Sequence, residues 1–185
     1  MTESIPEHPA LRSSEFRAAL RRMLRELLVT LLPAVLLALF TRTMVAEAAL
    51  IDGPSMQPNL YTGFAVVTEK ITYHVHTPQR GDVVLFDLPG ESQPLVKRIV
   101  GLPGEEVEVR GGHTYIDGVQ LEEPWVTYFG GPNYSTRVPP DSVFVLGDNR
   151  SNSRDSRSFG PIPREWIRGH AVFILWPPAR IRTMP

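Results

Sequence analysis

The feature that most limits the fold of this 185-residue chain is an apolar run, LLVTLLPAVLLALF, at residues 27–40. An arginine-rich segment precedes it, and apolar residues recur at helical spacing from Phe16 to Leu27, so we expect one helix that begins near Ser13. The run has about 14 residues, whereas a helix that crosses a bilayer needs roughly 20. This length leaves three interpretations open.

The three interpretations differ in the environment of the run. A helix buried in a protein core fits least well, because the run is apolar on all faces. A cleavable signal peptide would end at the small-residue triplet Ala46-Glu47-Ala48. An uncleaved membrane anchor would cover residues 23–44, with Arg25 and Arg42 reaching the two interfaces. In that case residues 1–22 form a cytoplasmic tail with a basic flank, and residues 45–185 lie outside the cytoplasm.

After the apolar run the pattern changes to short strands separated by turns. The chain contains 18 prolines and 14 glycines, which favours turns over helix. Apolar or β-branched stretches bounded by these residues predict strands at 64–68, 83–86, 95–100, 107–110, 114–116, 143–146 and 171–176. No alternation of strands with helices is visible, so we expect a mainly β domain, either a barrel or a sandwich.

Composition excludes several classes of function. The formal net charge of -1 gives no reason to expect a nucleic-acid partner. The absence of cysteine excludes disulfides, thiol catalysis and cysteine-ligated zinc. His74 and His76 would share one face of a strand, but no third ligand follows at a suitable spacing. We therefore predict no metal and no cofactor.

Two segments carry residues suited to hydrolysis. Ser55 lies between a glycine and two prolines, so a tight turn would present its hydroxyl group. Lys97, one of only two lysines in the chain, interrupts an apolar strand. Burial would lower its pKa, and a neutral lysine amine can take a proton from serine. Taken alone, each residue also fits an ordinary structural role, as a turn serine and a solvated lysine.

A third segment, residues 147–160, is polar but follows a predicted strand and ends in a Phe-Gly-Pro turn. Its acidic and basic side chains, Asp148, Arg150, Asp155 and Arg157, can form charge-assisted pairs that order the loop. The loop lacks the spacing of a calcium-binding loop and of a phosphate-binding loop.

Taken together, these segments resemble the bacterial type I signal peptidases, or leader peptidases, which are membrane-bound serine–lysine proteases. The resemblance extends over about residues 20–178, and its motifs occur in the family's order. They are GPSMQPNL at residues 53–60, RGDVV at 80–84, KRIVGLPG at 97–104 and GDNRSNSRDSRSFG at 147–160.

The resemblance implies roles for several residues in and beside these motifs. Ser55 would be the nucleophile and Lys97 the general base, while Ser153 would orient the lysine amine. Asp155 and Arg157 would form the ion pair of the site loop. Gly53 stands where some relatives carry a serine that helps to form the oxyanion hole, so backbone N–H groups, including that of Ser55, would stabilise the oxyanion. The residues expected to line the substrate pockets are Ile51, Met56, Leu60, Leu95 and Val96.

The implied enzyme cleaves N-terminal signal peptides from exported preproteins after small-x-small sites. Its partners would be preproteins and a phospholipid bilayer. It would be a single-pass plasma-membrane protein, with residues 45–185 as catalytic domain and about 105–140 as a smaller β extension. The resemblance favours an uncleaved anchor, and self-cleavage after Ala48 stays open. Exposed aromatic residues would contact the membrane interface, namely Trp125, Tyr128 and Phe129.

Three other interpretations compete with this one. Self-cleaving SOS-repressor-type proteins share a serine–lysine pair and a related β core, but the arginine-flanked apolar run argues against them. A processing peptidase of a pilus or conjugation system would have a similar architecture. A non-enzymatic membrane-tethered β module would use residues 147–160 as a binding surface, and would keep its function after replacement of Ser55.

Overall fold

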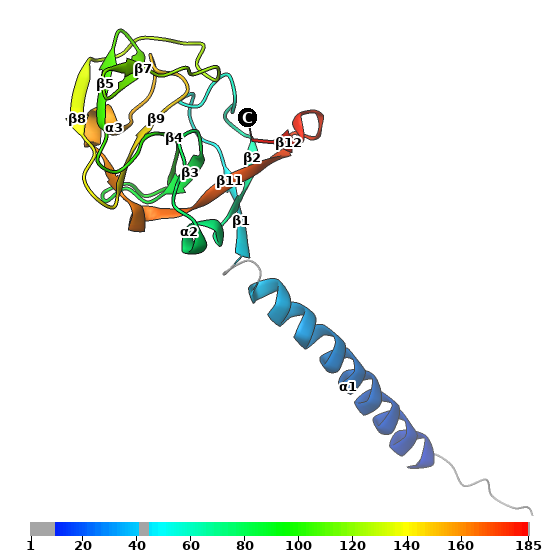
Figure 1. Ribbon diagram of the computed structural model, residues 1–185. Coiled ribbons are helices and arrows are strands. Elements are labelled where there is room, and N and C mark those ends of the chain that lie inside the picture. Colours follow the sequence, from blue (N-terminus) through cyan, green and yellow to red (C-terminus); the bar gives the residue numbers. More distant parts are fainter. Residues whose placement is uncertain (1–9, 41–44, 185) are drawn as a thin grey trace, which may run out of the picture. The chain divides into compact units, whose positions relative to one another are not determined.

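The computed structural model describes residues 10–40 and 45–184. The chain divides into two compact units, residues 1–43 and 44–185. In the first unit, helix α1 (Ala10–Phe40) covers both the arginine-rich segment and the apolar run, with Pro33 inside it (Figure 1). Within the described ranges, no helix combines the length and hydropathy that crossing a bilayer requires. Residues 1–9 of the expected tail and 41–44 of the expected anchor lie outside the described residues.

The second unit is mainly β, as expected, and its larger sheet has eight strands. The order along the sheet is β1-β2-β11-β3-β4-β9-β10, and β12 also pairs with β11 (Figure 1). The strands are β1 (Ala46–Leu50), β2 (Ala65–Glu69), β3 (Val83–Phe86), β4 (Leu95–Gly101), β9 (Ser142–Leu146), β10 (Ile162–Pro163), β11 (Ile167–Trp176) and β12 (Arg182–Thr183). All of these pairings are antiparallel. Strand β11 thus joins the β1–β2 hairpin to the β3–β4 hairpin.

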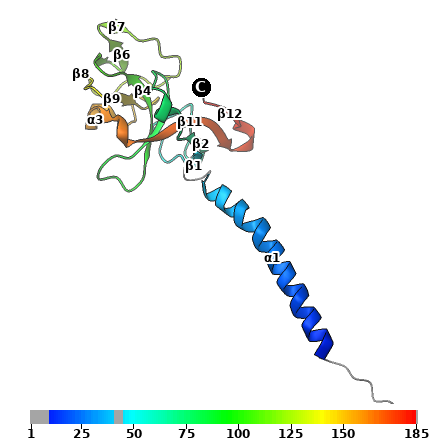
Figure 2. The ribbon, with the colours of Figure 1, turned by 60° about the horizontal axis from the view of Figure 1, so that its bottom comes forward.

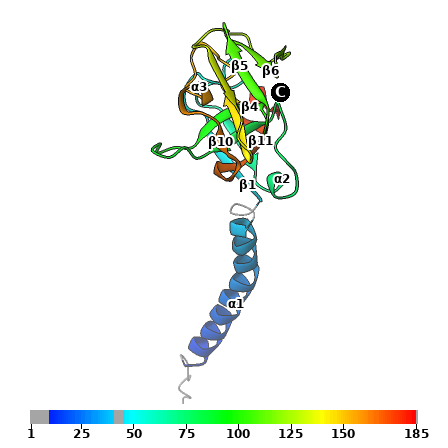
Figure 3. The same ribbon diagram turned by 60° about the vertical axis from the view of Figure 1, so that its left-hand side comes forward.

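A smaller four-stranded sheet has the order β7-β6-β5-β8 (Figures 2 and 3). Its strands are β5 (Glu106–Arg110), β6 (His113–Ile116), β7 (Val119–Gln120) and β8 (Tyr134–Arg137). Strand β5 buries Val107 and Val109 and leaves Glu106 and Arg110 exposed, as expected for a sheet with one face on a core. The whole sheet lies within the segment 105–140.

The short helices are α2 (Thr72–Val75) and α3 (Ser156–Phe159), with 3-10 turns at Arg164–Trp166 and Pro178–Arg180. The expectation that His74 and His76 share a strand face is wrong, because the chain forms α2 here. A carboxylate oxygen of Glu69 accepts hydrogen bonds from the N–H groups of Ile71 and Thr72 at 3.0 and 2.9 Å, which stabilises the start of this turn.

Five strands lie where none was predicted, namely β1, β7, β8, β10 and β12. The triplet Ala46-Glu47-Ala48, considered as a signal-peptide cleavage site, is part of β1, and each of its residues pairs with β2. Strand β8 lies between the strands expected at 114–116 and 143–146, where its residues pair with β5.

Candidate active site

Ser55 lies in the loop that connects β1 to β2. Gly53 has a φ of +89°, a conformation that favours glycine, so a serine at this position would be strained. The loop is closed by backbone hydrogen bonds from Gln57 N to Pro54 O at 3.1 Å and from Leu60 N to Met56 O at 2.8 Å. The Ser55 carbonyl accepts a hydrogen bond from Asn149 N at 3.0 Å. This contact ties the serine to the loop that follows β9.

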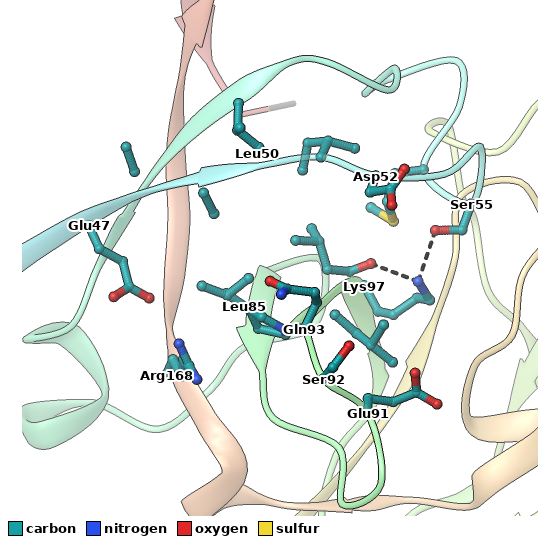
Figure 4. A pocket seen from close by; sticks show the side chains of 17 residues that line it. Glu47, Leu50, Asp52, Ser55, Leu85, Glu91, Ser92, Gln93, Lys97 and Arg168 are labelled. Carbon is teal, nitrogen blue, oxygen red and sulfur yellow. Dashed lines mark hydrogen bonds between the residues drawn. The ribbon is translucent and has the colours of Figure 1, made fainter.

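Lys97 on β4 forms a hydrogen bond with Ser55, although the two residues are 42 positions apart in the sequence. The distance from Lys97 Nζ to Ser55 Oγ is 2.8 Å, and Nζ also donates to the carbonyl oxygen of Val96 at 2.9 Å (Figure 4). Only 4% of the lysine surface is exposed, whereas Ser55 is partly exposed. The fold therefore brings together the two residues that sequence reasoning chose as nucleophile and base.

The environment of Lys97 favours its neutral form. Burial lowers the pKa of Lys97 from 10.5 to about 8, and the negative charges of Asp155 and Asp148 oppose this shift only in part. A substantial fraction of the amine is thus unprotonated slightly above neutral pH. In that state it can accept a proton from the hydroxyl it already contacts.

Ser153 does not donate to the lysine in this structure. Its Oγ is buried and has no hydrogen-bond partner among the described residues. The hydroxyl nevertheless lies close to the loop that carries Ser55, since a Cβ added to Gly147 would meet Ser153 Oγ at 2.3 Å and the Ser55 carbonyl oxygen at 2.5 Å. A residue larger than glycine at position 147 would displace both, which explains why glycine is needed here although its φ is ordinary.

Buried ion pairs hold the loop after β9. Asp155 accepts hydrogen bonds from Arg157 Nε and Nη2, both at 2.9 Å, and from the N–H of Gly147 at 3.1 Å, and the predicted pair is therefore present. Asp148 accepts from Arg98 Nε and Nη2, both at 2.8 Å. Sequence reasoning had looked for the partner of Asp148 within its own loop and missed Arg98, which lies on β4.

Ser55 and Lys97 both line a cavity of about 740 Å³. Of the five residues expected to line substrate pockets, four line this cavity, namely Ile51, Met56, Leu95 and Val96. Leu60 does not, because it is fully buried in the cluster that packs behind Ile51 and Met56. Sequence reasoning missed four charged residues of the cavity wall, which no motif marks, namely Glu47, Asp52, Glu91 and Arg168.

The three aromatic residues expected at a membrane interface differ in their surroundings. Trp125 is half-buried, with the Arg98 guanidinium 4.8 Å from its ring centroid, so it packs beside the buried ion pair instead of projecting from the surface. Tyr128 and Phe129 are 45% and 44% exposed, and Phe129 stacks on His113. Within residues 10–40 and 45–184, no three acidic, histidine or cysteine residues gather closely enough to hold a metal ion.

A hydroxyl group in contact with a buried amine of lowered pKa, at the edge of a cavity, is the arrangement of a hydrolase in which lysine activates serine. Comparison with known proteins agrees with this class. The family model described as signal peptidase, peptidase S26, matches residues 24–176. The chain therefore belongs to the signal peptidase family, peptidase S26, and is an enzyme of the signal peptidase I kind.

Curated relatives are similar over most of their length. A signal peptidase I from Leptolyngbya laminosa is 43% identical over 160 residues, which are 80% of this chain and 77% of that protein. A probable signal peptidase I-1 from Synechocystis sp. is 40% identical over 170 residues, 86% of each chain. Signal peptidase I P from Bacillus subtilis subsp. natto is 32% identical over 161 residues, 80% of this chain and 87% of that protein.

Proposed function

We propose that this enzyme cleaves signal peptides with Ser55 as nucleophile and Lys97 as general base. The observation that carries the proposal is the 2.8 Å contact between Ser55 Oγ and a lysine amine that is 4% exposed. When the amine is neutral, the serine hydroxyl donates to Nζ across the same contact. Lys97 then takes the proton as Oγ attacks the scissile carbonyl, and returns it to the leaving amine. A water molecule activated by the same amine hydrolyses the acyl-enzyme.

Two further groups support this chemistry. The backbone N–H of Ser55 donates no hydrogen bond within the described residues, so it is available to the oxyanion that forms on the substrate. Glycine at position 53 supplies no side-chain donor, so the proposed oxyanion hole is built from backbone groups. The buried, unpartnered hydroxyl of Ser153 is close enough to the loop to turn toward Lys97 and fix the orientation of the amine.

The cavity suits an extended peptide with small side chains. Strand β1 is the first strand of the sheet, so one of its edges can pair with substrate. Ala48 and Ala49 of this strand line the cavity together with Leu95 and Val96. The apolar residues Ile51, Met56, Leu95 and Val96 in the wall of the cavity favour cleavage after a small-x-small sequence.

We further propose that residues 23–44 anchor the enzyme in the plasma membrane, with the N-terminus in the cytoplasm. Helix α1 is 31 residues long, about 46 Å at the usual rise per residue, and its large apolar side chains from Leu24 to Leu39 are all exposed in the described structure. The arginines precede the apolar half of the helix, which is the charge distribution of a cytoplasmic flank.

A preprotein reporter with an Ala-x-Ala site tests the proposed function. The full chain, in detergent and phospholipid, is expected to cleave it after that site. Ser55→Ala should lower the rate by at least about a thousandfold, because no other group can form the acyl-enzyme. Lys70→Arg, a change at the other lysine that keeps its ion pair with Glu47, should retain the rate. Unchanged cleavage by Ser55→Ala would instead favour a contaminating protease or a non-enzymatic module.

The pH dependence of cleavage follows from the lysine. Because the base must be neutral, kcat/KM should rise about tenfold per pH unit at low pH and level off above the pKa of Lys97, which is about 8. Initial rates of cleavage of a peptide substrate between pH 5.5 and 10 measure this rise of kcat/KM with pH. A midpoint above 10 would mean that the lysine is solvated in the working enzyme. A midpoint near 6.5 would mean that a histidine is the base.

A further inference from the structure

Asp52 is a charged residue of the cavity wall that the proposed mechanism does not use. It lines the cavity together with Ser55 and Lys97, and it directly precedes Gly53 in the turn that leads to the serine. Figure 4 shows Asp52 at the same end of the cavity as the Ser55–Lys97 pair. A carboxylate at this place lies beside the position that the scissile bond of a substrate would take.

The charge of Asp52 differs from the other charges of this wall, because it has no counter-charge. The remaining charged side chains of the wall, apart from Lys97, form the ion pairs Glu47–Lys70, Glu91–Arg154 and Arg168–Asp87. Asp52 forms no hydrogen bond or ion pair with any residue of the ranges 10–40 and 45–184, and its side chain is exposed. Its negative charge is thus free to act on a bound substrate.

The direction of the Asp52 side chain follows from alternation along the chain. Ile51 continues the pairing of β1 with β2, since its N–H donates to the carbonyl oxygen of Phe64 at 2.8 Å. The Ile51 side chain is buried, whereas that of Asp52 is exposed, as expected for neighbours that point to opposite faces. Substrate side chains at −1 and −3 are proposed to enter the apolar part of the wall, to which Ile51 belongs. Those at −2 and +1 then point to the side of Asp52.

We propose that Asp52 selects for charge at the two substrate positions that flank −1, so that lysine or arginine at −2 or +1 is favoured and aspartate or glutamate is disfavoured. A basic side chain would approach the carboxylate at the exposed rim of the cavity, where the attraction is modest but adds to binding. An acidic side chain at the same place would be repelled. This inference rests on the proposed function, and it lets the enzyme discriminate among preproteins that share the same small residues at −1 and −3.

Asp52 is expected to act on the substrate directly, and not through the base. Besides burial, the groups that shift the pKa of Lys97 are Asp155 and Asp148. Replacing Asp52 should therefore leave the pH midpoint of kcat/KM where it is. A residue that acted through Lys97 would instead move this midpoint for every peptide, whatever the charge at −2 or +1.

The experiment uses Ala-x-Ala peptides with Lys, Gln or Glu at −2, and a second set with the same three residues at +1. The full chain is assayed in neutral detergent at pH 9, where most of Lys97 is neutral and a substrate lysine is still charged. At low salt, the wild type should cleave the Lys peptide about fivefold faster than the Glu peptide in kcat/KM, in at least one of the two sets. In about 0.5 M salt this ratio should fall to about twofold or less.

Two variants at position 52 test whether this charge is the cause. Asp52→Asn should reduce the Lys-to-Glu ratio to about one, and Asp52→Lys should reverse the preference. The matched controls are Glu122→Gln and Glu122→Lys, because Glu122 is also exposed and has no described ion pair, but does not line this cavity. Both controls should keep the wild-type ratio. Partial misfolding of a variant would lower all rates by the same factor, so it would not change the ratio.

The Ser55→Ala variant separates this inference from the proposed function. Its dissociation constants for the same peptides should show the charge preference without turnover. Cleavage that continues in Ser55→Ala would overturn the proposed function. The inference alone would be overturned by Ser55-dependent cleavage without a charge preference at either position, or by a preference that survives in both Asp52 variants. A shifted pH midpoint in Asp52→Asn with an unchanged ratio would also overturn it.

Discussion

Replacing Lys97 by methionine is expected to abolish cleavage and at the same time to stabilise the protein. Methionine fills a similar volume but has no amine, so no group can take the proton of Ser55, and kcat/KM should fall by at least about a thousandfold. The loss should hold at every pH, because the side chain that titrates is gone. The stabilisation follows from the same burial that lowers the pKa of Lys97.

The sign of the stability change comes from proton binding. The folded-state pKa of Lys97, about 8, lies below the ordinary value of 10.5, so the unfolded chain binds the proton more tightly. The stability lost through Lys97 is therefore greatest below pH 8 and is recovered as pH rises toward 10.5. A shift of this size corresponds to about 3 kcal/mol at neutral pH. Loss of the hydrogen bonds to Ser55 and Val96 offsets part of it, which leaves a net gain of about 2 kcal/mol.

Thermal unfolding of the full chain in detergent measures this gain. At pH 7 the midpoint of Lys97→Met should be roughly 4–8 °C above that of the wild type. The difference should shrink toward pH 10. Lys70→Met is the control, since Lys70 is a surface lysine with a single ion pair, and it should lower the midpoint slightly or not at all. A destabilised Lys97→Met at pH 7 would show that the lysine is charged and well paired in the folded state.

Replacing Asp148 by alanine is expected to have the largest destabilising effect of a change outside the apolar core. The carboxylate is fully buried and accepts three hydrogen bonds, two from Arg98 and one from Asn59 Nδ2 at 2.7 Å. Its removal leaves the guanidinium of Arg98, which is 1% exposed, without its counter-charge. Breaking a buried pair in this way costs about 3–5 kcal/mol. Asn149, which holds the Ser55 carbonyl, would lose its fixed neighbour, so activity should fall as well.

Urea unfolding gives the measurement for Asp148→Ala. The matched control is Glu108→Ala, which breaks the exposed pair with Arg110 and should cost less than about 1 kcal/mol. A loss of under 1 kcal/mol for Asp148→Ala would mean that water enters the site and solvates Arg98, so that the pair does not hold the loop after β9.

Local sequence patterns correctly predicted the strands that are determined by an apolar run and by the turn residues beside it. Residues 83–86 are an apolar run after a Gly-Asp turn, and the structure has β3 at Val83–Phe86. The β5–β6 hairpin also lies within a residue of its expected bounds, because the Gly111-Gly112 turn marks its position. Their segments also marked Ser55 and Lys97 as candidates, but each residue alone fits a structural role as well, and only the resemblance to the signal peptidases implied their roles as nucleophile and base.

What sequence reasoning missed depends on contacts between distant segments. Strand β1 reads AEAAL, which has little strand propensity, and it forms because five of its residues pair with β2. The sequence also did not predict which charged residues pair with one another. Arg150 pairs with Glu123 of the smaller β extension, and Arg98 pairs with Asp148. The half-buried place of Trp125 beside Arg98 also follows only from the fold.

The place of β11 in the larger sheet has a consequence for the biogenesis of the enzyme. The loop that carries Ser55 follows β1, and Lys97 lies on β4, but the strand that joins these two hairpins, β11 at Ile167–Trp176, comes after both of them in the sequence. A nascent chain that ends before residue 167 has no strand to join them, since long-range pairing must wait for its late partner. The proposed serine–lysine pair is therefore expected to assemble only after residue 176 has been translated, and no cleavage by this pair, including cleavage of the elongating chain itself, is expected before then.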